Sequence, residues 1–368
     1  MEAHAASSVG AATPSAGASS SAARGPLTYA STGVRQDLVG LALGKLLAAA
    51  RTNVPQGSGQ PVKLPGHFAG LIRIGRETVA LTTDNVGTKL LLARTLDRWE
   101  EVGEDVVAVN VNDLAAVGAR PSALVDYIAV QTPVPSVFEA IGKGMGRGLR
   151  ESRCHLVGGE TSVVPDLVKS LDLSGTALGF FPRGRSPVTG SQLRPEDVLI
   201  GLPSSGFHAN GYTLIRRLLE ENAVDVTRSL PGDRLPLGQR LLAPTRIYTR
   251  PVESLMDAHL PVALAHISGR GLRNLIRLNS KVRFLMDQLP PPEGVSRWIS
   301  TLSGLPSEEL YQTFNMGIGF IVAVRPRQVD RTLGLLRESG EKGARVIGRI
   351  EKGRGVYLPG EGVRYETY

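Results

Sequence analysis

Apolar residues recur at helical spacing along residues 38–51, and a segment rich in proline and glycine then interrupts the pattern. Because Pro55, Gly57, Gly59 and Pro61 lie in this second segment, we predict a helix followed by a loop. Short apolar runs typical of strands follow at 68–74, 78–83, 124–130, 155–157 and 174–181, with helical patterns at 105–117 and 137–152. This alternation predicts an α/β fold with mixed layers.

The helical pattern at 137–152 conflicts with its composition. Gly142, Gly144, Gly146 and Gly148 lie within it, and each costs a helix about 1 kcal/mol relative to alanine. A phosphate-binding loop is the alternative, but the spacing matches neither G-x-G-x-x-G nor a Walker A motif. We therefore favour the helix.

A polar segment rich in proline and glycine, 181–198, marks the best internal boundary. Beyond it the pattern predicts strands at 198–202, 318–324 and 344–350 and helices at 212–221, 267–278, 307–314 and 329–337, with no clear pattern elsewhere up to residue 250. We divide the chain into a tail (1–26), an N-terminal domain (27–185) and a C-terminal domain (186–368). The tail is dominated by Ala, Ser and Gly, so we expect it to be disordered.

Charge and composition exclude several classes of function. The 42 Lys and Arg residues outnumber the 34 Asp and Glu residues, giving a net charge of +8, yet aromatic residues make up only 5% of the chain. Without basic blocks or an aromatic platform we expect no nucleic-acid partner, but rather small phosphate-bearing anions. Cys154, the single cysteine, cannot form an internal disulfide, and no run of 18 apolar residues exists. We expect a cytoplasmic protein without a membrane span.

Residues typical of a site for a metal-bound polyphosphate follow the strand at 78–83. Asp84 is a hard oxygen ligand of the kind that Mg²⁺ prefers, and Gly87, Thr88 and Lys89 offer a turn, a hydroxyl and a cation for phosphate oxygens. An Asp-Asn turn that caps the next helix is the alternative.

Polar residues interrupt other apolar segments of the first domain. They are Asn112, Asp113, Asp126, Glu160, Thr161 and Asp172. A helix cap or a buried hydrogen bond would explain any one of them, but a buried carboxylate needs a partner or a cation, and the repetition indicates one shared cation site. Gly158 and Gly159 would let the backbone approach a ligand closely, although a tight turn explains them equally well.

Two segments of the second domain suggest an anion site. Ser204, Ser205, Gly206, His208 and Asn210 lie between a predicted strand and a predicted helix, whose N-terminus would attract a phosphate. The second segment, AHISGRGL, contributes His266, Gly269 and Gly271, and its histidine could move protons. Ordinary caps are the alternative for both. Asn315 and Gly317 lie at a predicted helix-to-strand junction, where the alternative to a binding role is simply the end of the helix.

Eight of these segments occur in the order found in phosphoribosylformylglycinamidine cyclo-ligases, the aminoimidazole ribonucleotide synthetases of purine biosynthesis. They are TTDNVGTKLLLA, VNDLAAVGARP, LVDYIA, LVGGET, SSGFHANGYTLIR, PTRIY, AHISGRGL and TFNMGIG. The sequence resembles this family from Tyr29 to about Ile350. The resemblance implies a two-domain fold in a homodimer, whose N-terminal domains share a barrel, with ATP and Mg²⁺ as cofactors and formylglycinamidine ribonucleotide as substrate.

The resemblance also implies roles for individual residues. Asp84, Asp113 and Glu160 would bind the metal. ATP would contact Asp84, Gly87, Thr88, Asn112, Asp126, Gly158, Gly159 and Thr161. The ribonucleotide would contact Ser204, Ser205, Gly206, Asn210, Gly269, Gly271 and Asn315. Lys89, His208 and His266 are the expected catalytic residues.

Three positions depart from the family pattern: Ser31 stands where an acid is usual, Asn85 where glycine is usual, and Val163 where a second acid is usual. Because of these departures, a second class of function stays possible, in which the protein binds a ribonucleotide but does not catalyse a reaction. Within the superfamily a thiamine-phosphate kinase is a further alternative. Selenophosphate synthetase is disfavoured because no reactive cysteine lies near the N-terminus.

Overall fold

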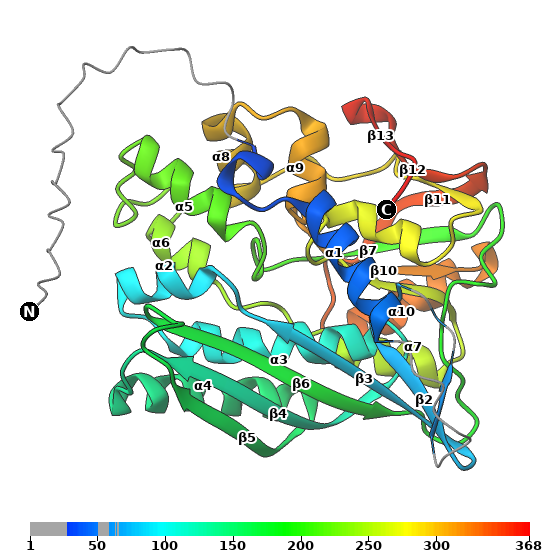
Figure 1. The fold of residues 1–368 in the computed structure, drawn as a ribbon. Coiled ribbons are helices and arrows are strands. Elements are labelled where there is room, and N and C mark those ends of the chain that lie inside the picture. The colour runs from blue at the N-terminus through cyan, green and yellow to red at the C-terminus, as the bar shows by residue number, and fades with distance from the viewer. Residues whose placement is uncertain (1–27, 51–58, 63, 65) are drawn as a thin grey trace, which may run out of the picture.

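Two β-sheets dominate the computed structural model, which describes residues 28–50, 59–62, 64 and 66–368 (Figure 1). The expected tail therefore lies outside the described residues, as do Pro55 and Gly57. The first sheet has the order β1-β2-β3-β6-β4-β5. Its strands are β1 (Gly59–Val62), β2 (Gly70–Ile74), β3 (Glu77–Asn85), β4 (Arg120–Val130), β5 (His155–Val163) and β6 (Leu171–Phe180). Only the β4–β5 pair is parallel among the described strand pairs of this sheet.

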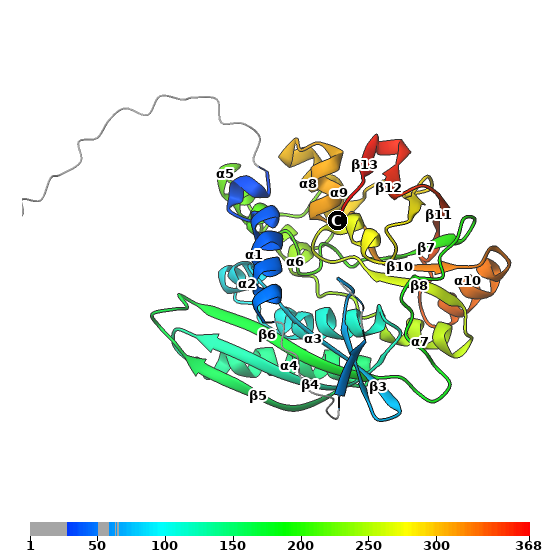
Figure 2. The ribbon, with the colours of Figure 1, turned by 45° about the vertical axis from the view of Figure 1, so that its right-hand side comes forward.

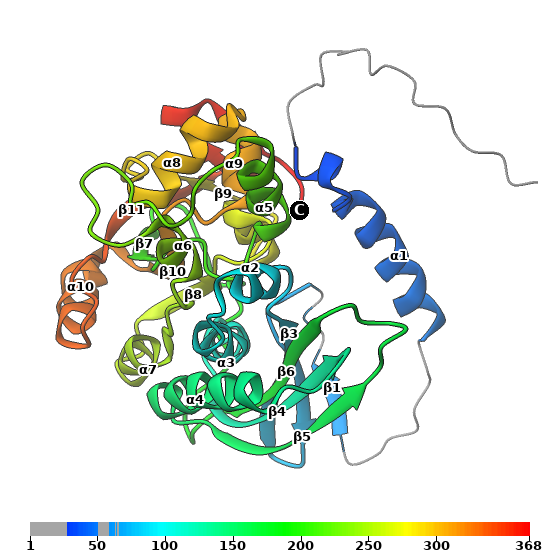
Figure 3. The same ribbon diagram turned by 90° about the vertical axis from the view of Figure 1, so that its left-hand side faces the viewer.

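Helices α3 (Glu100–Ala115) and α4 (Pro135–Ser152) cover one face of this sheet (Figure 3). α3 lies between the sheet and the second half of the chain, contacting β8 and α7 there (Figure 2). Most of α3 is buried, and the buried residues are mainly apolar, as is typical of a helix that other elements enclose.

The glycines of α4 are explained by the approach of the two helices. The predicted helix is confirmed, and a Cβ at Gly144 would lie 1.8 Å from the carbonyl oxygen of Glu100 on α3. A Cβ at Gly148 would likewise lie 2.9 Å from Val107. Close packing therefore outweighs the low helix propensity of glycine.

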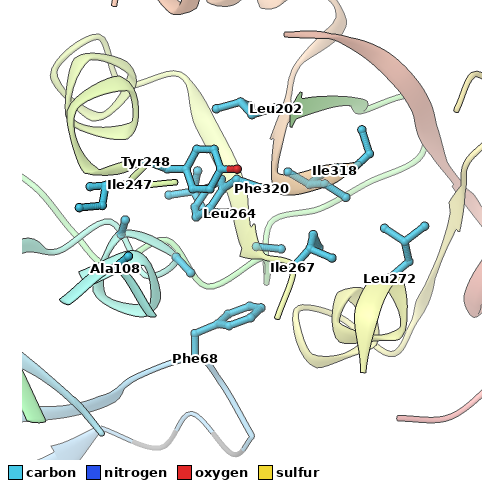
Figure 4. Packing of buried hydrophobic residues seen from close by; sticks show 14 of the residues in the cluster. Phe68, Ala108, Leu202, Ile247, Tyr248, Leu264, Ile267, Leu272, Ile318 and Phe320 are labelled. Carbon is cyan, nitrogen blue, oxygen red and sulfur yellow. The ribbon is translucent and has the colours of Figure 1, made fainter. Parts of the chain in front are cut away.

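The second sheet has the order β13-β12-β9-β11-β7-β10-β8. Its strands are β7 (Val198–Pro203), β8 (Pro261–His266), β9 (Val282–Leu285), β10 (Ile318–Val324), β11 (Arg345–Lys352), β12 (Gly355–Leu358) and β13 (Val363–Tyr365). Around it lie α5 (Tyr212–Glu221), α6 (Leu237–Leu242), α7 (Thr249–Asp257), α8 (Gly294–Ser303), α9 (Ser307–Thr313), α10 (Val329–Glu338) and the 3-10 helix η2 (Gly271–Arg277). Phe320 and Leu264 from this sheet pack with Tyr248, and Ala108 of α3 lies nearby (Figure 4).

Several predicted boundaries were wrong. The predicted loop contains β1, where Pro61 is tolerated because an edge strand need not donate every amide hydrogen. The strand predicted at 155–157 extends to Val163, and the helix predicted at 267–278 is the short 3-10 helix η2. The patterns missed α2 (Lys89–Leu96), α6, α7, α8, β8, β9, β12 and β13. Most of these elements are short, so too few residues repeat to reveal a period.

Helix α1 (Gln36–Ala49) confirms the first predicted helix but lies beside the rest of the molecule (Figure 3). Its apolar side chains are exposed; Leu41 and Leu46 are each 61% accessible. Within the described residues, no helix combines the length and apolar character needed to cross a membrane.

Candidate functional site

Two acids and a histidine from three elements meet between the two sheets. Asp84 lies near the end of β3, Asp113 near the end of α3, and His266 ends β8. Nδ1 of His266 lies 2.8 Å from Oδ1 of Asp113. Burial, reinforced by the charge of Asp113, raises the pKa of Asp84 to about 6. This group can hold a proton at its histidine and attract a cation at its paired carboxylates.

His67 and Arg277 border this acid–histidine group. The Arg277 guanidinium donates to the His67 carbonyl oxygen at 2.7 Å and lies 4.5 Å from the ring centre of Phe68. Burial, with Arg277 adding to the effect, lowers the pKa of His67 to about 4. His67 is therefore neutral near pH 7.

Glu160 does not join Asp84 and Asp113. In the strand register Asp84 and Asp126 both pair with Gly175, whereas Glu160 pairs with Tyr127. Since successive residues of a strand point to opposite faces, Glu160 lies on the face of the sheet that α3 does not cover. In the part of the chain that the structure describes, no three His, Cys, Asp or Glu side chains gather to hold a metal. The expected set of three carboxylates is not assembled within one chain.

The sequence suggested that Lys89 faces phosphate oxygens, but in the structure it does not face an open site. Its side chain is fully buried, and Nζ lies 2.6 Å from Oδ2 of Asp105 and 2.8 Å from the Ala243 carbonyl oxygen. Asp105 also accepts a hydrogen bond from the Thr245 amide at 2.7 Å. This buried ion pair connects α2 and α3 to the second half of the chain.

Asn112 has a similar connecting role. Its side chain donates to the Arg246 carbonyl oxygen at 2.8 Å and accepts from the Tyr248 amide at 2.9 Å. Hydrogen bonds to the segment before α7 therefore compensate the burial of these polar residues of α3. A contact between the Asn112 side chain and a nucleotide would require these bonds to break.

The predicted residues of the second domain do come together. Ser204 Oγ lies 3.1 Å from Asn315 Oδ1, and Asn315 donates to the Gly206 carbonyl oxygen at 2.8 Å. A Cβ at Gly269 would lie 3.5 Å from Asn210 Oδ1. Ser205 instead donates to the Pro244 carbonyl oxygen. Both predicted loops therefore lie against the turn before β10.

His208 lies behind His266. Their ring centres are 6.4 Å apart, and the side chain of His208 is fully buried. Burial lowers the pKa of His208 well below its usual value. Among the described residues, neither its ring nitrogens nor Nε2 of His266 has a hydrogen-bond partner.

The remaining predicted residues divide between a turn and a strand. Gly87 has a φ of 65°, and Thr88 Oγ1 lies 2.9 Å from Thr213 Oγ1. A Cβ at Gly159 would lie 2.2 Å from Asp126 Oδ1 and 3.0 Å from the Asp126 carbonyl oxygen, so a larger residue there would displace the Asp126 side chain. Gly158 and Thr161 lie exposed on β5, and a Cβ at Gly271 would clash with the Tyr311 carbonyl oxygen.

Sequence reasoning missed two residues that shape this region, Asp105 and Tyr248. Asp105 carried the same signal as Asp113, an acid inside an apolar helix. Tyr248 is fully buried beside His208 and donates to the Pro203 carbonyl oxygen at 2.8 Å. A Cβ at Gly319 would lie 2.0 Å from its hydroxyl oxygen, a constraint visible only in three dimensions.

Comparison with known proteins identifies the family. The AIR synthase related protein N-terminal domain matches residues 66–181, and the C-terminal domain matches 194–360. A phosphoribosylformylglycinamidine cyclo-ligase of Thermococcus gammatolerans is 40% identical over 92% of this chain and 99% of its own length. The chain belongs to the phosphoribosylformylglycinamidine cyclo-ligase family. Another such relative, from Methanothermobacter thermautotrophicus, is 40% identical over 84% of this chain and 91% of its own.

Solved structures of other proteins share the fold. A chain of the HypE–HypF complex superposes with a TM-score of 0.62 at 18% identity, covering 88% of this chain and 97% of that one. AaThiL complexed with AMPPCP and TMP gives a TM-score of 0.60 at 20% identity, covering 89% of this chain and 94% of that one. The two-domain α/β fold expected from the resemblance is confirmed.

Proposed function

We propose that this family member is an ATP-dependent phosphoribosylformylglycinamidine cyclo-ligase, which forms aminoimidazole ribonucleotide, ADP and phosphate. The observation that carries the proposal is 40% identity to enzymes of that name over 92% of the chain. The acid–histidine group between the two halves supports it. The likeness to thiamine-monophosphate kinase, at 22% identity, supports the fold alone.

The reaction replaces an oxygen by a nitrogen. The formyl oxygen of the substrate attacks the γ-phosphorus of ATP and ADP leaves. The amidine nitrogen then attacks the activated carbon, phosphate departs with the former formyl oxygen, and the nitrogen loses a proton. Such transfers depend mainly on positioning and on neutralising charge.

His266 is suited to receive that proton. When its Nδ1–H donates to the Asp113 carboxylate, the lone pair of Nε2 is left as the acceptor. Asp113 would thereby fix both the ring orientation and the tautomer. His208 packs behind this ring and would limit its movement.

Asp84 and Asp113 fit a Mg²⁺ ion. Asp84 and Asp113 are neighbouring, partly buried carboxylates, and burial first and the charge of Asp113 second raise the pKa of Asp84. A divalent cation relieves the repulsion between the two charges, and Mg²⁺ commonly takes one or two carboxylates with phosphate and water as its other ligands. The ion would supply charge neutralisation for the phosphoryl group.

We also propose a homodimer formed through the uncovered sheet face. Leu81, Val125, Tyr127 and Phe180 on this face are 38–46% exposed. An apolar patch of this kind is typical of an interface. Replacing Val125 with Lys should convert a dimer into monomers in sedimentation velocity; an unchanged sedimentation coefficient would contradict this interface.

The test of the activity is ADP release by purified protein. Release that requires both formylglycinamidine ribonucleotide and Mg²⁺ would support the ligase. Release with thiamine monophosphate instead would support a kinase. Binding of the ribonucleotide without ADP release would support a non-catalytic relative.

A further inference from the structure

A cavity of about 430 Å³ lies where the two ends of the described chain meet. It is bounded by the 3-10 helix η1 (Ala30–Thr32), the start of α1, η2, α9 and the last residue, Tyr368. Figures 1 and 3 show the C-terminus close to the beginning of α1. The volume is within the range of small-molecule sites, about 300–1,000 Å³.

Two guanidinium groups line this cavity, those of Arg270 and Arg273. Arg270 Nη2 donates to the Gln36 carbonyl oxygen at 3.2 Å, and its guanidinium lies 4.6 Å from the ring centre of Tyr368. Arg273 donates from Nε to the Thr367 carbonyl oxygen at 2.7 Å, from Nη1 to Gln312 Oε1 at 3.3 Å and from Nη2 to the Thr367 hydroxyl at 3.4 Å, which leaves one N–H on each of its Nη atoms. Burial, and then the charge of Arg270, lowers the pKa of Arg273. An anion between the two cations would relieve this repulsion.

The backbone of Arg270 is strained. Its φ of 74° is in the left-handed region that favours glycine. Strain of this kind persists where the surrounding structure imposes it, and such positions cluster at ligand sites. Because Arg270 keeps its charged side chain beside the cavity despite this backbone strain, we expect the side chain to have a function there.

A buried hydroxyl completes the lining. Thr313 is only 2% exposed, and within the described ranges its Oγ1 has no hydrogen-bond partner. Glu309, the carboxylate side chain among the described lining residues, already accepts hydrogen bonds from the Tyr29 amide and from Gln312. The N–H groups of the two guanidinium groups that these hydrogen bonds leave over, together with the Thr313 hydroxyl, match the oxygens of a phosphate monoester.

We infer that this cavity receives the 5′-phosphate of the ribonucleotide substrate, an inference that rests on the proposed function. Arg270 lies between Gly269 and Gly271, and Thr313 lies two residues before Asn315. The cavity therefore borders both loops proposed to bind the ribonucleotide. A metal-bound triphosphate would instead need carboxylates that can bind a cation, such as Asp84 and Asp113.

The test compares Arg270→Gly and Arg273→Gln with the control Arg331→Gln on the exposed face of α10. Arg270→Gly removes the cation and also relaxes the backbone, so the variant should fold. We expect KM for formylglycinamidine ribonucleotide to rise about tenfold or more in both variants, as the loss of a charge-assisted hydrogen bond implies. KM for ATP should stay within about twofold, and the control should match the wild type.

Other outcomes overturn the inference. A rise in KM for ATP alone would assign the cavity to the nucleotide triphosphate, and unchanged constants for both substrates would exclude a phosphate role. Calorimetric titration with ribose 5-phosphate separates this inference from the proposed function. Binding by wild-type protein that both variants lose would support the cavity even without turnover, whereas equal binding by all proteins would contradict it.

Discussion

Asp113 and His266 are 153 residues apart in the sequence, yet their side chains lie 2.8 Å apart. One comes from the helix that covers the first sheet and the other from the end of an edge strand of the second sheet. The contact joins the two halves at the point where both contribute polar groups. Asp113 therefore both orients the histidine and affects the charge of Asp84.

We expect Asp113→Asn to lower the turnover number at least about 100-fold while the fold is retained. The amide cannot stabilise a protonated His266 and loses the charge that a metal needs. ADP release and circular dichroism measure the two effects. Asp330→Asn on α10 is the matched control. Near-normal turnover of the Asp113 variant would contradict both proposed roles of this carboxylate.

Lys89→Met should destabilise the protein by about 3–5 kcal/mol, because it leaves Asp105 buried without its partner. The double variant Lys89→Met with Asp105→Leu should recover most of that loss. Urea denaturation gives the free energies of unfolding. If Lys89→Met were as stable as the wild type but inactive, Lys89 would act on phosphate rather than as a structural cation.

Gly144→Ala and Gly142→Ala should have opposite effects on stability. A Cβ at Gly144 would lie 1.8 Å from the Glu100 carbonyl oxygen, whereas nothing lies within 4 Å of a Cβ at Gly142. We expect the first change to lower the melting temperature, and the second to stabilise α4 by up to about 1 kcal/mol. Thermal unfolding of both variants checks this. Equal melting temperatures would mean that α4 and α3 can separate at no cost.

His67→Gln should reduce the loss of stability in acid. The pKa of His67 is about 4 in the folded protein, below its ordinary value of 6.5. Between these values the unfolded chain binds a proton that the folded protein does not, so stability falls as pH decreases. The variant should lose on the order of 2 kcal/mol less than the wild type between pH 7.5 and pH 5, as measured by urea denaturation at each pH. Parallel losses in the two proteins would contradict the buried, neutral state of His67.

Local pattern was sufficient for the longer elements. The strand predicted at 318–324 is β10, and the helix predicted at 212–221 is α5, because a sustained period or a fully apolar run reflects burial directly. The glycines of α4 were ambiguous by contrast. Helix propensity depends on the residue alone, whereas the reason for these glycines is a neighbouring helix.

The sequence by itself determined the family, the α/β class and the importance of acids placed in apolar segments. Only the tertiary structure decided what each acid does. Asp105 and Asp113 lie on the same helix with the same kind of neighbours, yet one pairs with Lys89 and the other with His266. The strand register likewise placed Glu160 on the face away from Asp84. A residue's type fixes the bonds it can form, but only the packing of distant segments determines which partner it meets.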